Sequence, residues 1–375
     1  MNTWRAGCGA NSHVRFGGRS GKTGGPQDPY RVSFRPYWNV LEGQVSLLLV
    51  NAQHMKQVPG RKTDAKDCEW IADLLRHGLL KASFVPDRPQ RELRELTRYR
   101  TTLIRERSAE ANRLQKTLEG ANIKLASVAT NILGQSGQEI LQALSAGSAD
   151  PSALADLAKG KLRAKLPQLE RALTGCVGVH QRFLVARQLA HIASLDDLIA
   201  EVSAEIAERL RPLEDELARL DTILGVGRLT AEVLLAEIGV DMSRFPTAGH
   251  LAAWAGMCPG NHESAGKRQS GKTRKGSKWL RAALVEAAQA AGRTKGTYLS
   301  AQYRRLTARR GKKRAAVAVG HTILTIAYHL LTRGTNYEDL GVTYFDERDR
   351  ARVERRLVGR LEALGYTVQL QRPAA

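Results

Sequence analysis

The chain has 375 residues, of which 42% are apolar, and its 58 lysines and arginines outnumber 37 acidic residues to give a formal net charge of +21. This length and apolar content exclude a wholly disordered protein and predict about two or three domains. The pI near 10.2 favours a nucleic-acid partner, ahead of an anionic membrane surface, and the absence of a long apolar run or signal-peptide centre predicts a cytoplasmic protein without a membrane span.

Residues 1–32 differ in composition from the rest of the chain. They are rich in glycine and basic residues, and Asp28 is their only carboxylate. Because no helical or strand periodicity accompanies this composition, we predict a disordered leader. The run Gly21-Lys-Thr23 lacks the first glycine and the preceding strand of a phosphate loop, so we assign it no nucleotide site. The abrupt change of composition near Ser33 predicts a truncated or frame-shifted start.

Residues 33–85 are predicted to form a partial α/β domain. The apolar run 45–50 is typical of a buried strand, and Thr63 can cap a helix whose first turn places Asp64 and Asp67 on one face. Carboxylates at a helix start ordinarily offset the helix dipole. The alternative is a metal site, because Mg²⁺ prefers carboxylate oxygen and nucleases use such pairs.

Residues 86–215 are predicted to be helical. We expect a long charged helix over residues 91–118, followed by a linker-like series of short helices to about Val179. A second long helix has apolar residues that alternate by three and four over 192–206, and the pattern continues to Leu220 after a stutter. This spacing predicts a coiled coil, within the chain or between subunits, with no chemistry of its own.

Residues 216–375 begin with two apolar helices joined by a glycine turn. The turn contains Gly225 and Gly227 and resembles a helix-hairpin-helix module, whose backbone N–H groups bind DNA phosphate. An ordinary helical hairpin is the alternative. No Asp or Glu occurs between Glu286 and Glu338, and a single-sign stretch of this length predicts a nucleic-acid-binding face. A closing helix and a short strand are expected near the end of the chain.

A basic loop between Glu263 and Arg281 is the strongest candidate site. Its glycines allow close approach to a ligand, its cations neutralise phosphate, and its serine hydroxyls can bind or attack phosphate. A flexible loop without chemistry is the alternative, but the apolar helical stripe from Leu280 to Ala291 favours an ordered site. The predicted nucleic-acid-binding residues of the loop are Lys267, Arg268, Lys272, Arg274, Lys275, Lys278 and Arg281.

These motifs together resemble the DEDD-type insertion-sequence transposases, the IS110 family. The resemblance extends from about Phe34 to the C-terminus and rests on the motifs Thr63-Asp-Ala-Lys-Asp67, Trp70-Ile-Ala-Asp-Leu-Leu75, Gly225-Val-Gly227, Pro259-Gly-Asn-His-Glu-Ser-Ala-Gly266 and Lys275-Gly-Ser-Lys-Trp-Leu-Arg281. It implies a RuvC-like N-terminal domain, a coiled-coil middle and a C-terminal transposase domain. It further implies a DNA recombinase guided by a structured RNA, and strand exchange implies a homodimer or homotetramer.

The resemblance assigns individual residues. Asp64 and Asp67 match the last two acidic residues of the family's metal-binding tetrad, which implies Mg²⁺ as the cofactor. Ser264 matches the nucleophilic serine, which would form a covalent link to the cleaved strand, and Ser270 is the second candidate. No residue before Ser33 matches the first acidic ligand, and Asp28 matches the second only by coincidence. A catalytically dead, nucleic-acid-binding relic of a transposase is therefore the alternative function.

The predicted fold is consequently α/β plus mostly α. A partial RNase H-like, RuvC-like α/β domain is followed by a helical coiled-coil region and by a mostly helical C-terminal transposase domain with a helix-hairpin-helix-like element.

Overall fold

A computed structural model describes residues 35–50, 67–80, 82–260, 262–264, 266–273 and 275–370, with the backbone alone at 35–37, 67–68, 262–264 and 268–269. The predicted leader and the proposed metal ligand Asp64 lie outside these residues. The chain divides into two compact units, Met1–Pro86 and Asp87–Ala375. Helices dominate the described residues, which confirms the mostly helical part of the prediction.

The described part of the first unit consists of two helices and the segments beside them. Helix α1 spans Arg35–Leu41 and α3 spans Asp67–Arg76, so the helix predicted to carry Asp67 is confirmed from that residue onward. The buried strand predicted over 45–50 is wrong. The backbone there forms only isolated bridges, Glu42 with Val45 and Val50 with Ala82, and Leu48 is 44% exposed. A strand becomes buried only when neighbouring strands and a covering layer enclose it, and the described residues supply neither.

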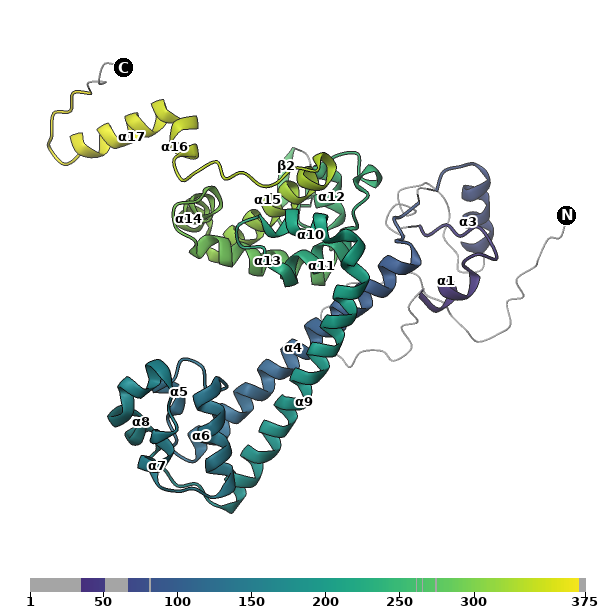
Figure 1. The fold of residues 1–375 in the computed structure, drawn as a ribbon. Helices are drawn as coiled ribbons and strands as arrows, with labels where there is room; N and C mark the ends of the chain where they lie inside the picture. Colours follow the sequence, from purple (N-terminus) through teal and green to yellow (C-terminus); the bar gives the residue numbers. More distant parts are fainter. Residues whose placement is uncertain are drawn as a thin grey trace. The chain divides into compact units, whose positions relative to one another are not determined.

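Two long helices run side by side in the second unit (Figure 1). Helix α4 spans Arg88–Gly120 and α9 spans Val179–Leu210, which confirms both predicted long helices. The pair is antiparallel, because Glu92 near the start of α4 binds Arg209 near the end of α9 at 3.1 Å, while Arg107 binds Asp196 farther along. Leu103 of α4 is among the buried apolar residues of the pair.

The predicted continuation of the second long helix to Leu220 is interrupted. A short 3-10 turn, Arg211–Leu213, follows α9, and a separate helix α10 then spans Glu214–Asp221. Pro212 explains the interruption, because proline has no N–H to donate and its ring collides with the preceding turn of an α-helix. The stutter in the apolar pattern therefore marks a break between two helices.

The region predicted as a linker of short helices folds into a lobe with its own core. It contains α5 (Leu125–Val128), α6 (Gln135–Ala146), α7 (Pro151–Asp156), a 3-10 segment (Gly160–Lys165) and α8 (Leu166–Leu173). Ile140, Leu154 and Leu169 are fully buried and share one core with Leu118 of α4 and Val185 of α9. The short helices are confirmed, but they form the packed end of the helix pair.

A third group of helices forms the C-terminal lobe. It contains α10, α11 (Arg228–Ile238), a 3-10 turn (Met242–Arg244), α12 (Ala248–Trp254), α13 (Lys278–Arg293), α14 (Tyr298–Arg310) and α15 (Lys312–Arg333). Helix α15 packs against α10, α12, α13 and α14, and Val319 and Ile323 on it are fully buried. Its 22 residues are long and apolar enough to cross a bilayer by composition alone, yet here they serve as the central core helix.

The chain ends with two helices beyond this lobe, α16 (Tyr344–Arg348) and α17 (Arg350–Glu362). The predicted closing helix is confirmed by α17. The predicted short strand is wrong, since residues 366–370 form no strand.

Candidate nucleic-acid interface and active site

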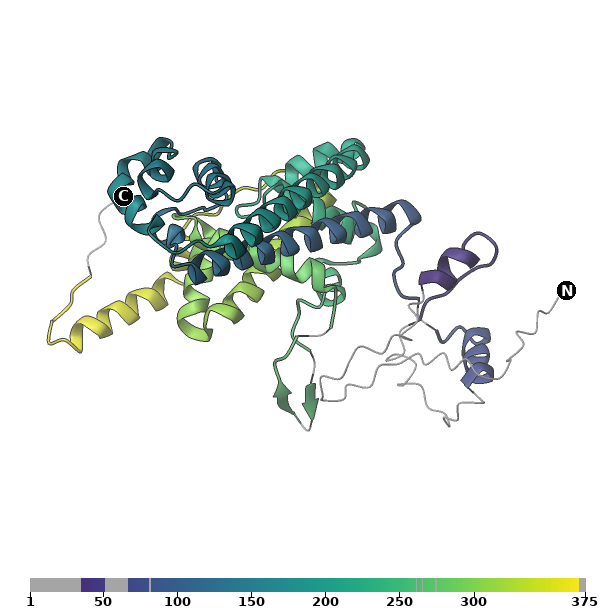
Figure 2. The same cartoon turned by 90° about the horizontal axis from the view of Figure 1, so that it is seen from below.

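The basic loop folds into a β-hairpin. Strands β1 (His262–Ser264) and β2 (Lys267–Ser270) pair antiparallel, and an isolated bridge between Pro259 and Thr273 continues the pairing toward the helices. Figure 2 shows the hairpin extending away from the helices of the C-terminal lobe. Backbone pairing therefore orders the described residues between Gly260 and Thr273, and Gly260 N–H donates to Lys272 O at 2.8 Å.

The two candidate serines occupy different places on this hairpin. Ser264 pairs with Lys267 across residues 265–266, so it is the last paired residue of β1 before the turn. Ser270 ends β2 nearer the helices, and its Oγ accepts the N–H of Lys272 at 3.2 Å. The structure describes the backbone alone at Ser264, and both catalytic assignments stay predictions.

The base of the hairpin joins the helices at Gly276. A Cβ at this position would lie 2.2 Å from the carbonyl oxygen of Ala255, at the end of α12. Because such an approach is impossible for any side chain, Gly276 lets the chain pass directly over α12. The next residue, Ser277, caps α13 by accepting the N–H of Leu280 at 3.3 Å, which is the ordinary role of serine before a helix.

A buried carboxylate holds this capping serine in place. Glu237 of α11 is 1% exposed and accepts hydrogen bonds from Ser277 Oγ (3.1 Å) and from Arg98 Nε (2.7 Å) and Nη2 (2.9 Å) of α4. Arg94 of α4 donates from Nε to the carbonyl oxygen of Ala236 at 3.0 Å. Burial of charge is tolerated only when each charge is paired and hydrogen-bonded. The hairpin base is thereby tied to α4 and α11.

A second ion-pair network lies on α11. Arg100 Nη1 of α4 and Glu232 Oε2 are 2.6 Å apart, and both side chains are almost fully buried. Arg228 Nε contacts the other oxygen of Glu232 at 3.0 Å and also binds Glu214 of α10. Hydrogen bonds from Arg228 lower the pKa of Glu214, and the two carboxylates raise the pKa of Arg228. These pairs join α4, α10 and α11 into one rigid support.

Sequence reasoning missed both Ser277 and Glu237 as positioning residues. The sequence does contain a signal for each of these two residues. Ser277 stands directly before the apolar stripe of α13, in the position of a helix cap. Glu237 is a carboxylate within an apolar helix, and a buried acid of this kind calls for a buried cation.

The predicted nucleic-acid-binding cations have differing surroundings. Lys267, Lys272, Lys275 and Lys278 are exposed, while Arg268 and Arg274 lie beyond the described side chains. Arg281 is half-buried and donates from Nη1 to Thr273 Oγ1 at 2.8 Å, so its guanidinium also braces the hairpin base. The four exposed lysines leave the hairpin and the start of α13 with a positive surface.

The glycine turn between α10 and α11 is built around one close contact. Gly225 has φ of 90° in the left-handed region, and a Cβ there would lie 2.5 Å from the carbonyl oxygen of Ala287 on α13. Packing against α13 therefore explains Gly225. Gly227 precedes α11, is exposed, and has open space at its Cβ position. The assignment of both glycines to phosphate binding stays a prediction.

The predicted metal ligands lie in the first unit. Asp67 is the first residue of α3, and its side chain and Asp64 are outside what the structure describes. Within the described residues, no group of three or more His, Cys, Asp or Glu side chains could hold a metal ion.

Comparison with known proteins identifies relatives of both ends of the chain. Residues 217–304 match the family model described as "Transposase IS116/IS110/IS902 family", and residues 31–123 match a second transposase model, DEDD_Tnp_IS110. A "Transposase for insertion sequence element IS1111A" from Coxiella burnetii is 26% identical over 77% of this chain and 72% of its own length. A "Probable family 20 transposase" from Pseudomonas aeruginosa is 27% identical over 77% of this chain and 78% of its own length. A "Pilin gene-inverting protein" from Moraxella bovis is 31% identical over 34% of this chain and 40% of its own length.

Proposed function

Because the chain belongs to the IS110 family of insertion-sequence transposases, we propose that Ser264 is the nucleophile with which it cleaves and rejoins DNA strands. The observation that carries this proposal is the place of Ser264, the last paired residue at the end of an ordered, cationic hairpin. This end of the hairpin extends away from the helices, where a DNA backbone can approach it, while the hairpin base is held by Gly276 and by the contact of Ser277 with Glu237.

The chemistry proceeds by two phosphoryl transfers. Ser264 Oγ forms a bond to phosphorus, the bond from phosphorus to one bridging sugar oxygen breaks, and the serine proton passes to solvent while that sugar oxygen leaves as a hydroxyl. In the second transfer a sugar hydroxyl of the new partner strand attacks the phosphoserine and releases Ser264. The covalent intermediate conserves the energy of the phosphodiester bond, so rejoining needs no nucleotide hydrolysis. Lys267 and Lys272 stabilise the charge that develops on the phosphate.

Asp64 and Asp67 are the residues that would hold Mg²⁺. Two carboxylates three residues apart, at and just before the start of α3, supply the hard oxygen donors that this ion prefers. When bound, the ion would offset negative charge on the phosphate.

The finer points of the family resemblance belong to the same proposal. We propose that a structured RNA guides the choice of DNA, that the active form is a homodimer or homotetramer in the cytoplasm, and that the first unit has a RuvC-like fold. We further propose that α4 and α9 pack as a coiled coil. The glycine turn at Gly227 is proposed to bind DNA phosphate as a helix-hairpin-helix. The open, exposed surroundings of Gly227 support the last point.

A covalent-trapping assay tests the proposal. Labelled DNA, guide RNA and Mg²⁺ are incubated with the wild type, with Ser264→Ala and with the matched control Ser270→Ala. The expected result is a covalent protein–DNA adduct in the wild type and in Ser270→Ala, and its loss in Ser264→Ala. An adduct lost only in Ser270→Ala would move the nucleophile to β2. A wild type that binds DNA without forming an adduct would instead indicate a nucleic-acid-binding relic.

A further inference from the structure

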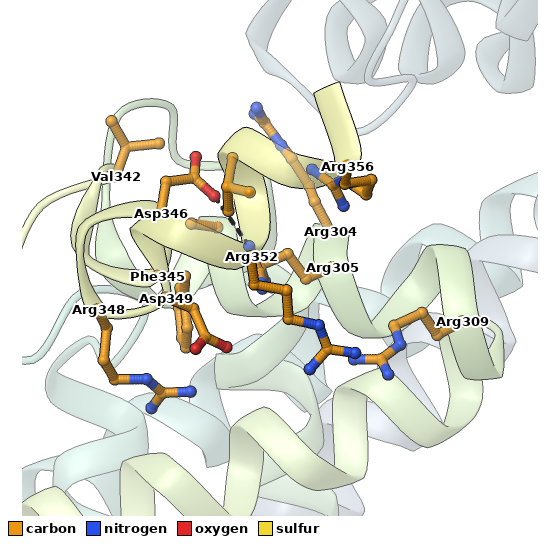
Figure 3. A pocket seen from close by; sticks show the side chains of 12 residues that line it. Arg304, Arg305, Arg309, Val342, Phe345, Asp346, Arg348, Asp349, Arg352 and Arg356 are labelled. Carbon is orange, nitrogen blue, oxygen red and sulfur yellow. Dashed lines mark hydrogen bonds and ion pairs between the residues drawn. The ribbon is translucent and has the colours of Figure 1, made fainter. Parts of the chain in front are cut away.

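An arginine-lined groove lies between α14 of the C-terminal lobe and the pair α16 and α17, and none of its lining residues belongs to the hairpin (Figure 3). Its cavity volume is about 880 Å³. Six arginines from the three helices line it, and no lysine does: Arg304, Arg305, Arg309, Arg348, Arg352 and Arg356. We call this set the arginine groove.

Part of the arginine groove is held together by its own contacts. Arg305 Nη1 binds Asp346 Oδ1 at 3.0 Å, and the guanidinium carbons of Arg305 and Arg348 lie 5.1 Å and 5.5 Å from the centre of the Phe345 ring. Phe345 in turn stacks on Tyr298 of α14, with 5.1 Å between ring centres and an interplanar angle of 13°. An aromatic platform therefore fixes one wall of the groove.

The remaining four arginines are exposed and form no ion pair within the described part of the chain. Figure 3 shows the side chains of Arg309 and Arg352 pointing toward one another across the groove. Asp349 is the second acid of the groove, after Asp346. Two guanidinium groups that converge in this way repel each other unless an anion lies between them. The six arginines of the groove face only the two carboxylates of Asp346 and Asp349, so four of their positive charges are unbalanced by the groove's own residues.

We propose that the arginine groove binds the sugar–phosphate backbone of a nucleic-acid strand. Guanidinium groups bind phosphate oxygens in a planar, bidentate geometry that lysine cannot reproduce, which accounts for a groove lined by arginine alone. Arg304 and Arg309 on α14 are separated by roughly 7.5 Å along the helix axis, and Arg352 and Arg356 on α17 by roughly 6 Å. Two such pairs facing one another match consecutive phosphates of a strand better than one isolated phosphate group.

The groove joins two segments whose basic residues are far apart in the sequence. The carboxylate-free stretch between Glu286 and Glu338 supplies α14, and the mixed-charge end of the chain supplies Arg348, Arg352 and Arg356. This inference rests on the proposed function only in that the chain acts on nucleic acid. It does not depend on Ser264 as a nucleophile.

Equilibrium binding by the full-length chain tests the inference. Fluorescence anisotropy is measured with a labelled DNA single strand, its duplex and an RNA hairpin, between about 50 and 200 mM salt. The groove variant carries Arg309→Gln, Arg352→Gln and Arg356→Gln. The matched control carries Lys116→Gln, Lys161→Gln and Arg163→Gln, which remove equal charge from exposed positions on α4 and on the α5 to α8 lobe.

The expected result is at least a tenfold loss of affinity in the groove variant, with the log–log salt slope shallower by about two to three, because each lost phosphate contact contributes about 0.7 to 0.9. The log–log salt slope of the control variant is expected to stay within about one half of the wild-type slope. The nucleic acid that loses most affinity identifies whether the groove takes DNA or RNA. A second variant with the same three arginines replaced by lysine keeps the net charge and the fold, and several-fold weaker binding is expected because the bidentate contacts are lost.

Three outcomes would overturn the inference. The first is a groove variant that binds all three probes with the wild-type slope, and the second is an equal loss in the control, which would show that net charge alone matters. The third is a loss confined to anionic lipid vesicles, tested in parallel, which would make the groove a membrane contact. These binding results can be interpreted even if the covalent-trapping assay fails, because anisotropy requires no covalent adduct.

Discussion

Arginine has opposite roles in two regions of the second unit. Where α4 meets α11, Arg98 is half-buried and Arg100 is buried, and each contacts a buried carboxylate, at 2.7 Å to Glu237 and 2.6 Å to Glu232. In the arginine groove, Arg352 and Arg356 are exposed and without an acidic partner in the described chain. The side chain is the same, but in one region its charge is satisfied within the protein and in the other it is left for a partner.

This difference separates residues that hold the lobe together from residues that bind. Buried ion pairs are destabilising to break, because removal of one partner leaves an uncompensated charge. Exposed arginines contribute little to stability, so their number in the groove calls for another explanation. Substitutions where α4 meets α11 should therefore lower stability, and substitutions in the arginine groove should lower binding.

Replacement of Glu237 by alanine should have the largest effect. It leaves the half-buried Arg98 without its carboxylate and removes the buried acceptor of Ser277, so the free energy of unfolding should fall by about 3 to 5 kcal/mol. Urea denaturation followed by tryptophan fluorescence measures the change. The control is Glu205→Ala, which removes an exposed pair with Arg209 and should cost at most about 1 kcal/mol. Equal losses in the two variants would abolish the distinction between the regions.

Replacement of Gly225 by alanine should come next. The new Cβ would overlap the carbonyl oxygen of Ala287, and φ at this position is 90°, so we expect a loss of about 1 to 3 kcal/mol. Thermal unfolding gives the readout. Gly227→Ala is the matched control two residues away, with open space at its Cβ position. If it lowered the free energy of unfolding as much as Gly225→Ala, the destabilisation would come from the turn itself and not from its packing on α13.

Replacement of Arg352 by alanine should leave stability almost unchanged. The side chain is exposed, and surface substitutions of this kind alter the free energy of unfolding by about 0.5 kcal/mol or less. The same urea experiment applies, with Arg100→Ala as the buried counterpart. A destabilisation of several kcal/mol in Arg352→Ala would mean that the groove is part of the structural support.

The smallest effect concerns His321, a half-buried residue of the central helix α15. Burial lowers the pKa of His321, so the unfolded chain takes up this proton at a higher pH than the folded chain. Neutral His321 therefore contributes to the free energy of unfolding above about pH 6.5, the ordinary pKa of histidine. This contribution is lost as the pH falls below that value. The melting temperature of His321→Gln should therefore decline less than that of the wild type between pH 7.5 and 5.5. His180→Gln, at an exposed position, should follow the wild type.

Local patterns predicted much of the helical fold. The charged run before Leu118 and the apolar spacing from Ile192 to Ile206 both correspond to helices, because an amphipathic period of 3.6 is written directly in the sequence. Pro212 is visible in the sequence, but the apolar pattern continues on both sides of it, so the break between α9 and α10 was not predicted. The α5 to α8 lobe could not be foreseen, since its core draws on Leu118 and Val185 from helices far apart in the chain.

The candidate site was predictable in part. The loop composition identified the segment around Ser264, but its pairing as a hairpin depends on backbone bonds such as Gly260 to Lys272, and glycine-rich sequence specifies strand pairing weakly. The contact of Ser277 with Glu237 joins residues 40 positions apart. The arginine groove likewise needs tertiary structure, although the spacing of four between Arg348, Arg352 and Arg356 was visible. Contacts across such separations leave no local trace in one sequence.

Helix α4 acts as a strut between two packed lobes. Arg98 is anchored in the network on α11, while Leu118 is buried in the core of the α5 to α8 lobe. The two residues belong to one uninterrupted helix, which places them roughly 30 Å apart along its axis. Because the helix is unbroken and packs along α9, the separation of these two contacts is set by the number of residues between them. Helix α4 thereby links the hairpin-bearing lobe to the α5 to α8 lobe, which holds none of the predicted catalytic residues.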